Sequence, residues 1–218
     1  MNELIFITHA FTVSACALLA LRLGKEALIA FVCLQGILAN LFVTKQITLF
    51  QLNATGSDAY TIGIVLGLNL LQEYYGKEIT KKAIWISFFT LLFYSVATYI
   101  HLGYAPSPVD TMHDHFAAIL NHMPRIVIAS LSVYLVVQQI DAWFFGVLQK
   151  VFNNRFLTLR YCISISLCQL LDTVLFSFLG LYGLVDNLGQ IIFISYTVKL
   201  AAIAISIPCV TFSKKLFR

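Results

Sequence analysis

The sequence predicts an all-α protein that crosses a membrane with about seven helices. Apolar residues make up 60% of the 218 residues and charged residues only 11%, whereas soluble domains carry about 25% charged residues. The mean hydropathy is +0.87. A membrane β-barrel is not expected, because its strands are about 10 residues long and alternate strictly, and these apolar runs are longer and more uniform.

Seven apolar segments approach the length of about 20 residues that a membrane-spanning helix needs. In chain order they are Leu4–Leu21, Ala27–Thr44, Ala59–Tyr75, Ala83–Tyr104, Ile126–Leu148, Tyr161–Leu181 and Leu188–Phe212. They make residues 1–218 a single transmembrane domain. A six-span alternative requires a peripheral or cleaved first segment. Residues 1–3 lack the Lys or Arg of a signal peptide, so we expect this segment to be retained.

The basic residues predict the orientation of the chain. Only Lys45 and Arg125 lie on one side of the seven segments, and Lys199 lies within a segment. The other side carries Arg22, Lys25, Lys77, Lys81, Lys82, Lys150, Arg155, Arg160, Lys214, Lys215 and Arg218. Cytoplasmic loops are rich in Lys and Arg. We therefore expect a multi-pass protein of the bacterial inner membrane, with the N-terminus outside, the C-terminus cytoplasmic, and no nucleic-acid partner.

Two outer loops differ in character. Gln46–Asp58 contains the polar turn cluster 53–58. It can fold back into the protein, since non-helical backbone is tolerated at membrane depth where it lines a cavity. The second loop, Ala105–Pro124, contains three prolines, which keep it from continuing either neighbouring helix.

Four charged residues lie inside the apolar segments: Glu73, Asp141, Asp172 and Lys199. Charge within a bilayer is costly, so such residues usually face a cavity, a substrate or one another. They predict a carrier of a polar molecule.

Further polar residues share helix faces with these charges. Asn69, Gln72 and Glu73 lie at i, i+3 and i+4, which places them on one face. They are candidates for a substrate-cavity wall; alternatively, Glu73 pairs with Lys77 and reaches water. Gln138 and Asp141 also share a face, where hydrogen bonding between helices is an equal alternative.

The last two helices predict an ion pair. Gln169 and Asp172 share a face of one helix, and Tyr196 and Lys199 share a face of the next. Counting about 1.5 Å per residue places Asp172 and Lys199 near the middle of the bilayer. We expect the two charges to pair there within a substrate site, although a purely structural pair is an alternative. Together the polar side chains suit a planar ligand rich in hydrogen-bonding groups.

Several function classes find no support in the sequence. It has no P-loop, no H-E-x-x-H and no G-x-S-x-G motif, so we expect no ATP binding of its own and no hydrolase chemistry. No C-x-x-C pair occurs. The histidines of the second outer loop are expected to be solvated. We therefore predict neither a metal nor a cofactor, and no enzymatic activity.

Four short motifs resemble the queuosine precursor transporter family, also called the vitamin uptake transporter family. In order they are Asn69-Leu70-Leu71-Gln72-Glu73-Tyr74-Tyr75-Gly76-Lys77 followed by Ala83-Ile84-Trp85-Ile86, then Gln139-Ile140-Asp141, Asp172-Thr173, and Tyr196 with Lys199. The resemblance covers 27–218, and the first helix lies beyond the usual six. It implies import of deazaguanine bases for queuosine in tRNA: the cyano and aminomethyl precursors, or queuine.

The sequence also departs from the family pattern. The family often has Asp where this chain has Asn69, and an acidic residue where it has Ser195. These two departures imply either a different substrate within the class or the absence of proton coupling through those positions. The leading hypothesis is a transporter with facilitated or ion-coupled uptake. Two alternatives are a substrate-binding subunit of an ATP-driven vitamin importer and a membrane-embedded enzyme. The oligomeric state, including a homodimer, is left open.

Overall fold

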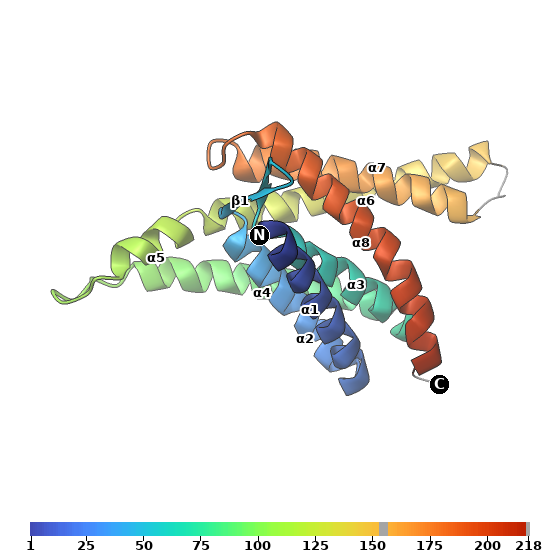
Figure 1. The fold of residues 1–218 in the computed structure, drawn as a ribbon, viewed down its shortest axis with the longest axis horizontal. Helices are drawn as coiled ribbons and strands as arrows, with labels where there is room; N and C mark the ends of the chain where they lie inside the picture. The colour runs from blue at the N-terminus through green and yellow to red at the C-terminus, as the bar shows by residue number, and fades with distance from the viewer. Residues whose placement is uncertain (153–156, 217–218) are drawn as a thin grey trace.

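The computed structural model describes residues 1–152 and 157–216 and consists mainly of long helices (Figure 1). Its helices and strands are α1 (Asn2–Leu23), α2 (Lys25–Phe42), β1 (Gln46–Leu49), β2 (Leu52–Thr55), α3 (Asp58–Tyr75), α4 (Lys77–Leu102), α5 (His113–Leu120), α6 (Met123–Val151), α7 (Leu157–Phe176), the π-helix η1 (Ser177–Leu181) and α8 (Leu188–Leu216).

Each of the seven predicted segments corresponds to a long helix in the described part of the chain. Four stretches there are long and apolar enough to cross a membrane by length and composition: Asn2–Leu23, Lys25–Phe42, Glu78–Leu102 and His113–Tyr134. The helical membrane architecture predicted from the sequence is thereby confirmed. The number of spans and the orientation of the termini stay predictions.

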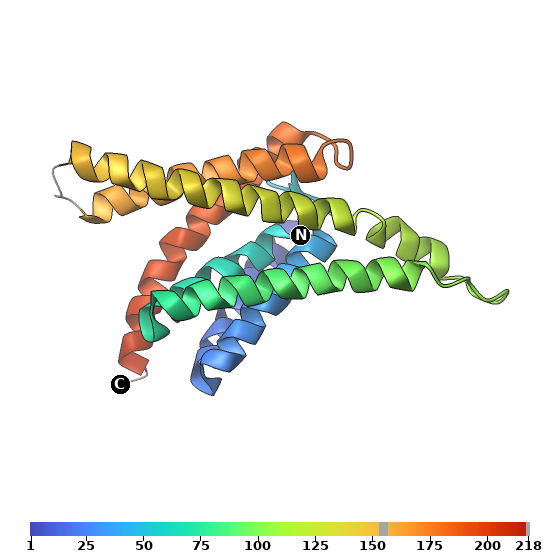
Figure 2. The ribbon, with the colours of Figure 1, turned by 180° about the vertical axis from the view of Figure 1, so that it is seen from behind.

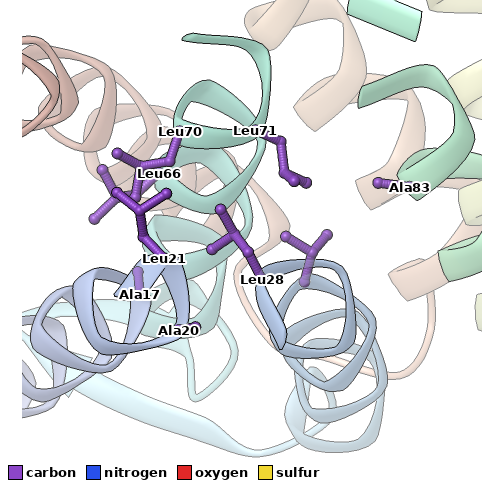
Figure 3. Packing of buried hydrophobic residues seen from close by; sticks show 9 residues of the cluster. Ala17, Ala20, Leu21, Leu28, Leu66, Leu70, Leu71 and Ala83 are labelled. Atoms are coloured by element: carbon purple, nitrogen blue, oxygen red, sulfur yellow. The ribbon is translucent and has the colours of Figure 1, made fainter. Parts of the chain in front are cut away.

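The helix α3 lies at the centre of the arrangement. It packs against α1, α2, α4 and α8. The antiparallel pair α6 and α7 runs along one side of this group, and α8 descends from the α7 side past α3 (Figures 1 and 2). The largest apolar cluster lies where α1, α2 and α3 meet, with Leu28, Leu66 and Leu70 fully buried (Figure 3).

Glycines separate two pairs of consecutive helices. Gly24 lies between α1 and α2 with φ of 111°, and Gly76 lies between α3 and α4 with φ of 84°. Side chains disfavour this positive-φ backbone, which glycine adopts readily. Each glycine therefore ends one helix and lets the chain start the next without an intervening loop.

The two outer loops contain more regular structure than expected. The segment Gln46–Thr55 forms an antiparallel hairpin, with Leu49 and Ala54 buried against Ile194 of α8. Burial of these apolar side chains explains why the segment folds back onto the helices. The proline-containing loop includes α5, and Pro124 lies in the first turn of α6, where its missing N–H is not needed.

The N-terminal helix holds the hairpin in place. Glu3 Oε1 accepts a hydrogen bond from the Phe50 amide at 3.1 Å, and Asn2 Nδ2 donates to the Thr48 carbonyl at 3.0 Å. From the other side, Gln190 of α8 accepts from the Asn53 amide at 2.9 Å. The additional first helix is therefore part of the fold rather than an independent appendage.

Replacing Glu3 with alanine is expected to loosen the hairpin. The Phe50 amide loses its acceptor, so the hairpin loses one of its hydrogen bonds to α1. Hydrogen–deuterium exchange across 46–55 should therefore be faster than in the unaltered protein. Glu26→Ala is the matched control, because Glu26 lies in the first turn of α2 and pairs with Lys25 instead. Equal exchange in both variants would contradict the contact's role.

Candidate functional site

A pocket of about 360 Å³ lies between the helices. Helices α2, α3, α4, α6, α7 and α8 all contribute to it, together with η1 and the end of the hairpin. Small-molecule pockets usually measure about 300–1,000 Å³. Its polar lining residues are Asn40, Thr55, Ser57, Asp58, Thr61, Ser87, Ser130, Tyr134, Gln169, Asp172, Thr173, Ser177, Ser195 and Lys199.

An ion pair lies in the pocket wall. Lys199 of α8 donates from Nζ to Asp172 Oδ2 of α7 at 2.5 Å, with 15% and 31% of the two side chains exposed. The predicted pairing of these two charges is confirmed. The place of this pair in a substrate site stays a prediction.

The helix α7 presents a polar stripe to the pocket. Gln169, Asp172 and Thr173 follow at i, i+3 and i+4, and all three line it. Thr173 Oγ1 donates to the Gln169 carbonyl at 2.7 Å, which fixes its hydroxyl along the helix. The stripe continues into η1 through Ser177. Short π-helical turns within helices are frequent at functional sites.

A carboxylate that sequence reasoning did not select, Asp58, also lines the pocket. It is the first residue of α3 and is only 5% exposed. Ser195 Oγ donates to Asp58 Oδ1 at 2.7 Å. Asp58 Oδ2 has no hydrogen-bond partner among the described residues. The polar cluster 53–58 was the available signal, but Asp58 precedes its apolar segment and therefore resembled a loop residue.

The predicted α3 residues lie farther along the helix than the pocket. Thr61, Val65 and Leu68 line it, and Gln72 continues the same stripe one turn later. Asn69, Gln72 and Glu73 do not line the pocket, and the last two are exposed. The three residues do share a face of α3, as their spacing predicts. That face begins where the pocket ends.

The remaining predicted residues divide into two groups. Tyr196 is half-buried and does not line the pocket, because Ser195 and Lys199 form the pocket-facing stripe of α8. The side chains of Gln138, Gln139 and Asp141 lie outside the described residues.

Aromatic rings form part of the apolar wall. Phe88 of α4 and Tyr134 of α6 line the pocket and meet edge to face, with ring centroids 4.6 Å apart. Phe176 also lines it. Trp85 and Trp143, by contrast, are exposed on the outer surface. The pocket therefore combines flat apolar faces with a charged and hydroxyl-rich rim, which suits a planar polar molecule.

Comparison with known proteins identifies the family. A family model described as "Putative vitamin uptake transporter" matches residues 55–213, which include Asp58, Asp172 and Lys199. The "Probable queuosine precursor transporter" of Bacillus subtilis (strain 168) is 30% identical over 197 residues, covering 88% of this chain and 86% of the relative. No solved structure matches the chain. This chain is thus a multi-pass protein of the bacterial inner membrane and belongs to the vitamin uptake transporter family.

Proposed function

We propose that this protein imports queuosine precursors, namely queuine or related deazaguanine bases, across the inner membrane. The observation that carries the proposal is the pocket in which Asp58 and the Asp172–Lys199 pair face one space between the helices. The printed name of the Bacillus subtilis relative supports this substrate class.

The donor and acceptor pattern of a deazaguanine base suits this pocket. Its ring N–H and exocyclic amine are hydrogen-bond donors, and a carboxylate such as Asp172 accepts hydrogen bonds from both. Its carbonyl oxygen accepts a hydrogen bond from the ammonium of Lys199 or from the side-chain amide of Gln169. Phe176 and the Phe88–Tyr134 pair offer flat faces for the ring. Aromatic contacts of this kind add to burial of the ring itself.

The other predicted residues have a place in the same proposal. Gln72 extends the pocket stripe of α3 towards the end that the basic loops mark as cytoplasmic, with Asn69 and Glu73 beside it. We assign these three to the exit path of the substrate. Tyr196, Gln138 and Asp141 are assigned to the surroundings of the site. Seven spans with an outer N-terminus complete the proposed topology.

Uptake into cells tests the function. A bacterial strain that cannot make queuosine should regain the modified nucleoside in its tRNA when it expresses this protein and is supplied with queuine or a precursor base. Failure with every candidate base, despite correct insertion, would overturn the proposal. Purified protein in liposomes separates a self-sufficient transporter from a subunit of an ATP-driven importer: movement of labelled base without ATPase partners supports the former.

A further inference from the structure

The charges around the pocket do not balance. Among the described residues that line it, the titratable ones are Asp58, Tyr134, Asp172 and Lys199. The ammonium of Lys199 is paired with Asp172, although it is close enough to act electrostatically on Asp58 as well. Two carboxylates therefore share one ammonium. With every carboxylate ionised, the pocket would carry one uncompensated negative charge.

The surplus charge falls on Asp58. Its Oδ1 accepts the hydrogen bond from Ser195, while its Oδ2 is buried without a partner among the described residues. The amide and the hydroxyl of Thr55 also act on this carboxylate, and the same hydroxyl lies 2.8 Å from Ser57 Oγ. An isolated ionised carboxylate is very costly in such surroundings, and a group in that situation usually becomes neutral.

The elements packed around Asp58 offer no other counter-charge in the described residues. From α8 comes Lys199, from α7 Asp172 and from α6 the neutral Tyr134, while α2, α4 and β2 contribute only uncharged residues to the pocket. On the α1 side, His9 packs against the ring of Tyr60, with centroids 4.5 Å apart.

We propose that Asp58 Oδ2 binds a proton and that this proton travels with the transported base. The O–H bond forms with a proton taken from water on the outer side, and the proton returns to water on the cytoplasmic side. Because Oδ2 has almost no accessible surface, a proton fits where a larger cation does not. With the proton bound, Asp58 is neutral and Lys199 balances Asp172, so the titratable groups that line the pocket sum to zero charge.

The proton site can be tested without any cargo. Infrared difference spectroscopy of the purified protein at about pH 5 should show the carbonyl stretch of a protonated carboxyl group, although an ordinary aspartate, with a pKa of about 3.9, is largely ionised there. Asp58→Asn should remove this band. The control Asp114→Asn, in the first turn of the exposed α5, should retain it. Absence of the band in the unaltered protein, or its persistence in Asp58→Asn, would overturn the proposal.

Thermal unfolding measures whether the Asp58→Asn variant still folds normally. Asparagine resembles a protonated aspartate, so Asp58→Asn should melt close to the unaltered protein at about pH 5. Asp172→Asn should melt lower, because it leaves Lys199 without its partner. A fall for Asp58→Asn as large as that for Asp172→Asn would contradict a neutral Asp58.

Coupling to transport rests on the proposed function and is tested in liposomes that hold the full chain. With the outside more acidic, labelled queuine or aminomethyl precursor should accumulate up to about tenfold per pH unit if one proton accompanies each base. Asp58→Asn should lose the accumulation that the pH gradient drives, whatever its remaining rate of uptake. Uptake that ignores the gradient overturns the coupling and leaves the proposed function standing. An infrared band at Asp58 without movement of any base overturns the proposed function and leaves the proton site standing.

Discussion

Lys199→Ala is expected to abolish uptake of the base and also to destabilise the protein. The substitution leaves Asp172 without its ammonium partner in the wall of a pocket that Asp58 also lines. Removing one partner of a buried pair costs about 3–5 kcal/mol. Because 31% of the Asp172 side chain is exposed, water offsets part of this cost, and we expect a loss of about 1–3 kcal/mol.

A charge-balanced double variant separates stability from transport. Asp172→Asn combined with Lys199→Met removes both charges together, so no unpaired ion remains at this position. Since neutral replacement of a whole pair is often tolerated, the double variant should regain most of the melting temperature lost by either single variant. It should nevertheless remain inactive, because the groups that bind the substrate are still missing.

Uptake and thermal unfolding are measured on the same preparations. Asp114→Asn in α5 serves as the surface control and should retain uptake. Normal uptake by Asp172→Asn and by Lys199→Ala, at normal expression, would remove the pocket from the transport path. Normal uptake by the double variant alone would show that the pair has a structural role only.

The residues predicted best are those whose chemistry conflicts with their local sequence. Asp172 and Lys199 are charged residues within apolar helices, and the cost of burying either alone predicts a partner. Helical spacing then determines which face each occupies, so their ion pair could be expected before the fold was known.

Asp58 and the α3 stripe show where that reasoning ends. Asp58 stands beside Ser195, a residue 137 positions later in the chain, and no local pattern encodes such a contact. Asn69, Gln72 and Glu73 do share a face, but periodicity cannot say how far along a helix the pocket extends. The extent of the pocket along α3 depends on how α2, α4 and α8 pack against this helix, and these contacts come from tertiary packing.

Gly67→Ala is expected to weaken the packing of α3 against α2. A Cβ atom at this position would lie 2.6 Å from Cγ2 of Val32, a side chain that is 2% exposed. Valine in a helix has essentially one rotamer, so Val32 cannot turn away. Small residues allow such close approach of membrane helices. Overpacking costs about 1–3 kcal/mol, of which the better helix propensity of alanine returns up to about 1 kcal/mol.

A compensating substitution tests the cause. Val32→Ala removes the clashing methyl group, and the next atoms near the new Cβ belong to Phe31 at 3.7 Å or beyond, which is ordinary contact. The double variant Gly67→Ala with Val32→Ala should therefore melt higher than the sum of the two single effects predicts. Gly189→Ala is the control, because an added Cβ in α8 meets nothing within 4 Å. Thermal unfolding and size-exclusion chromatography in detergent provide the measurement. Additive losses in the double variant would show that close approach of α2 and α3 is not what requires glycine at this position.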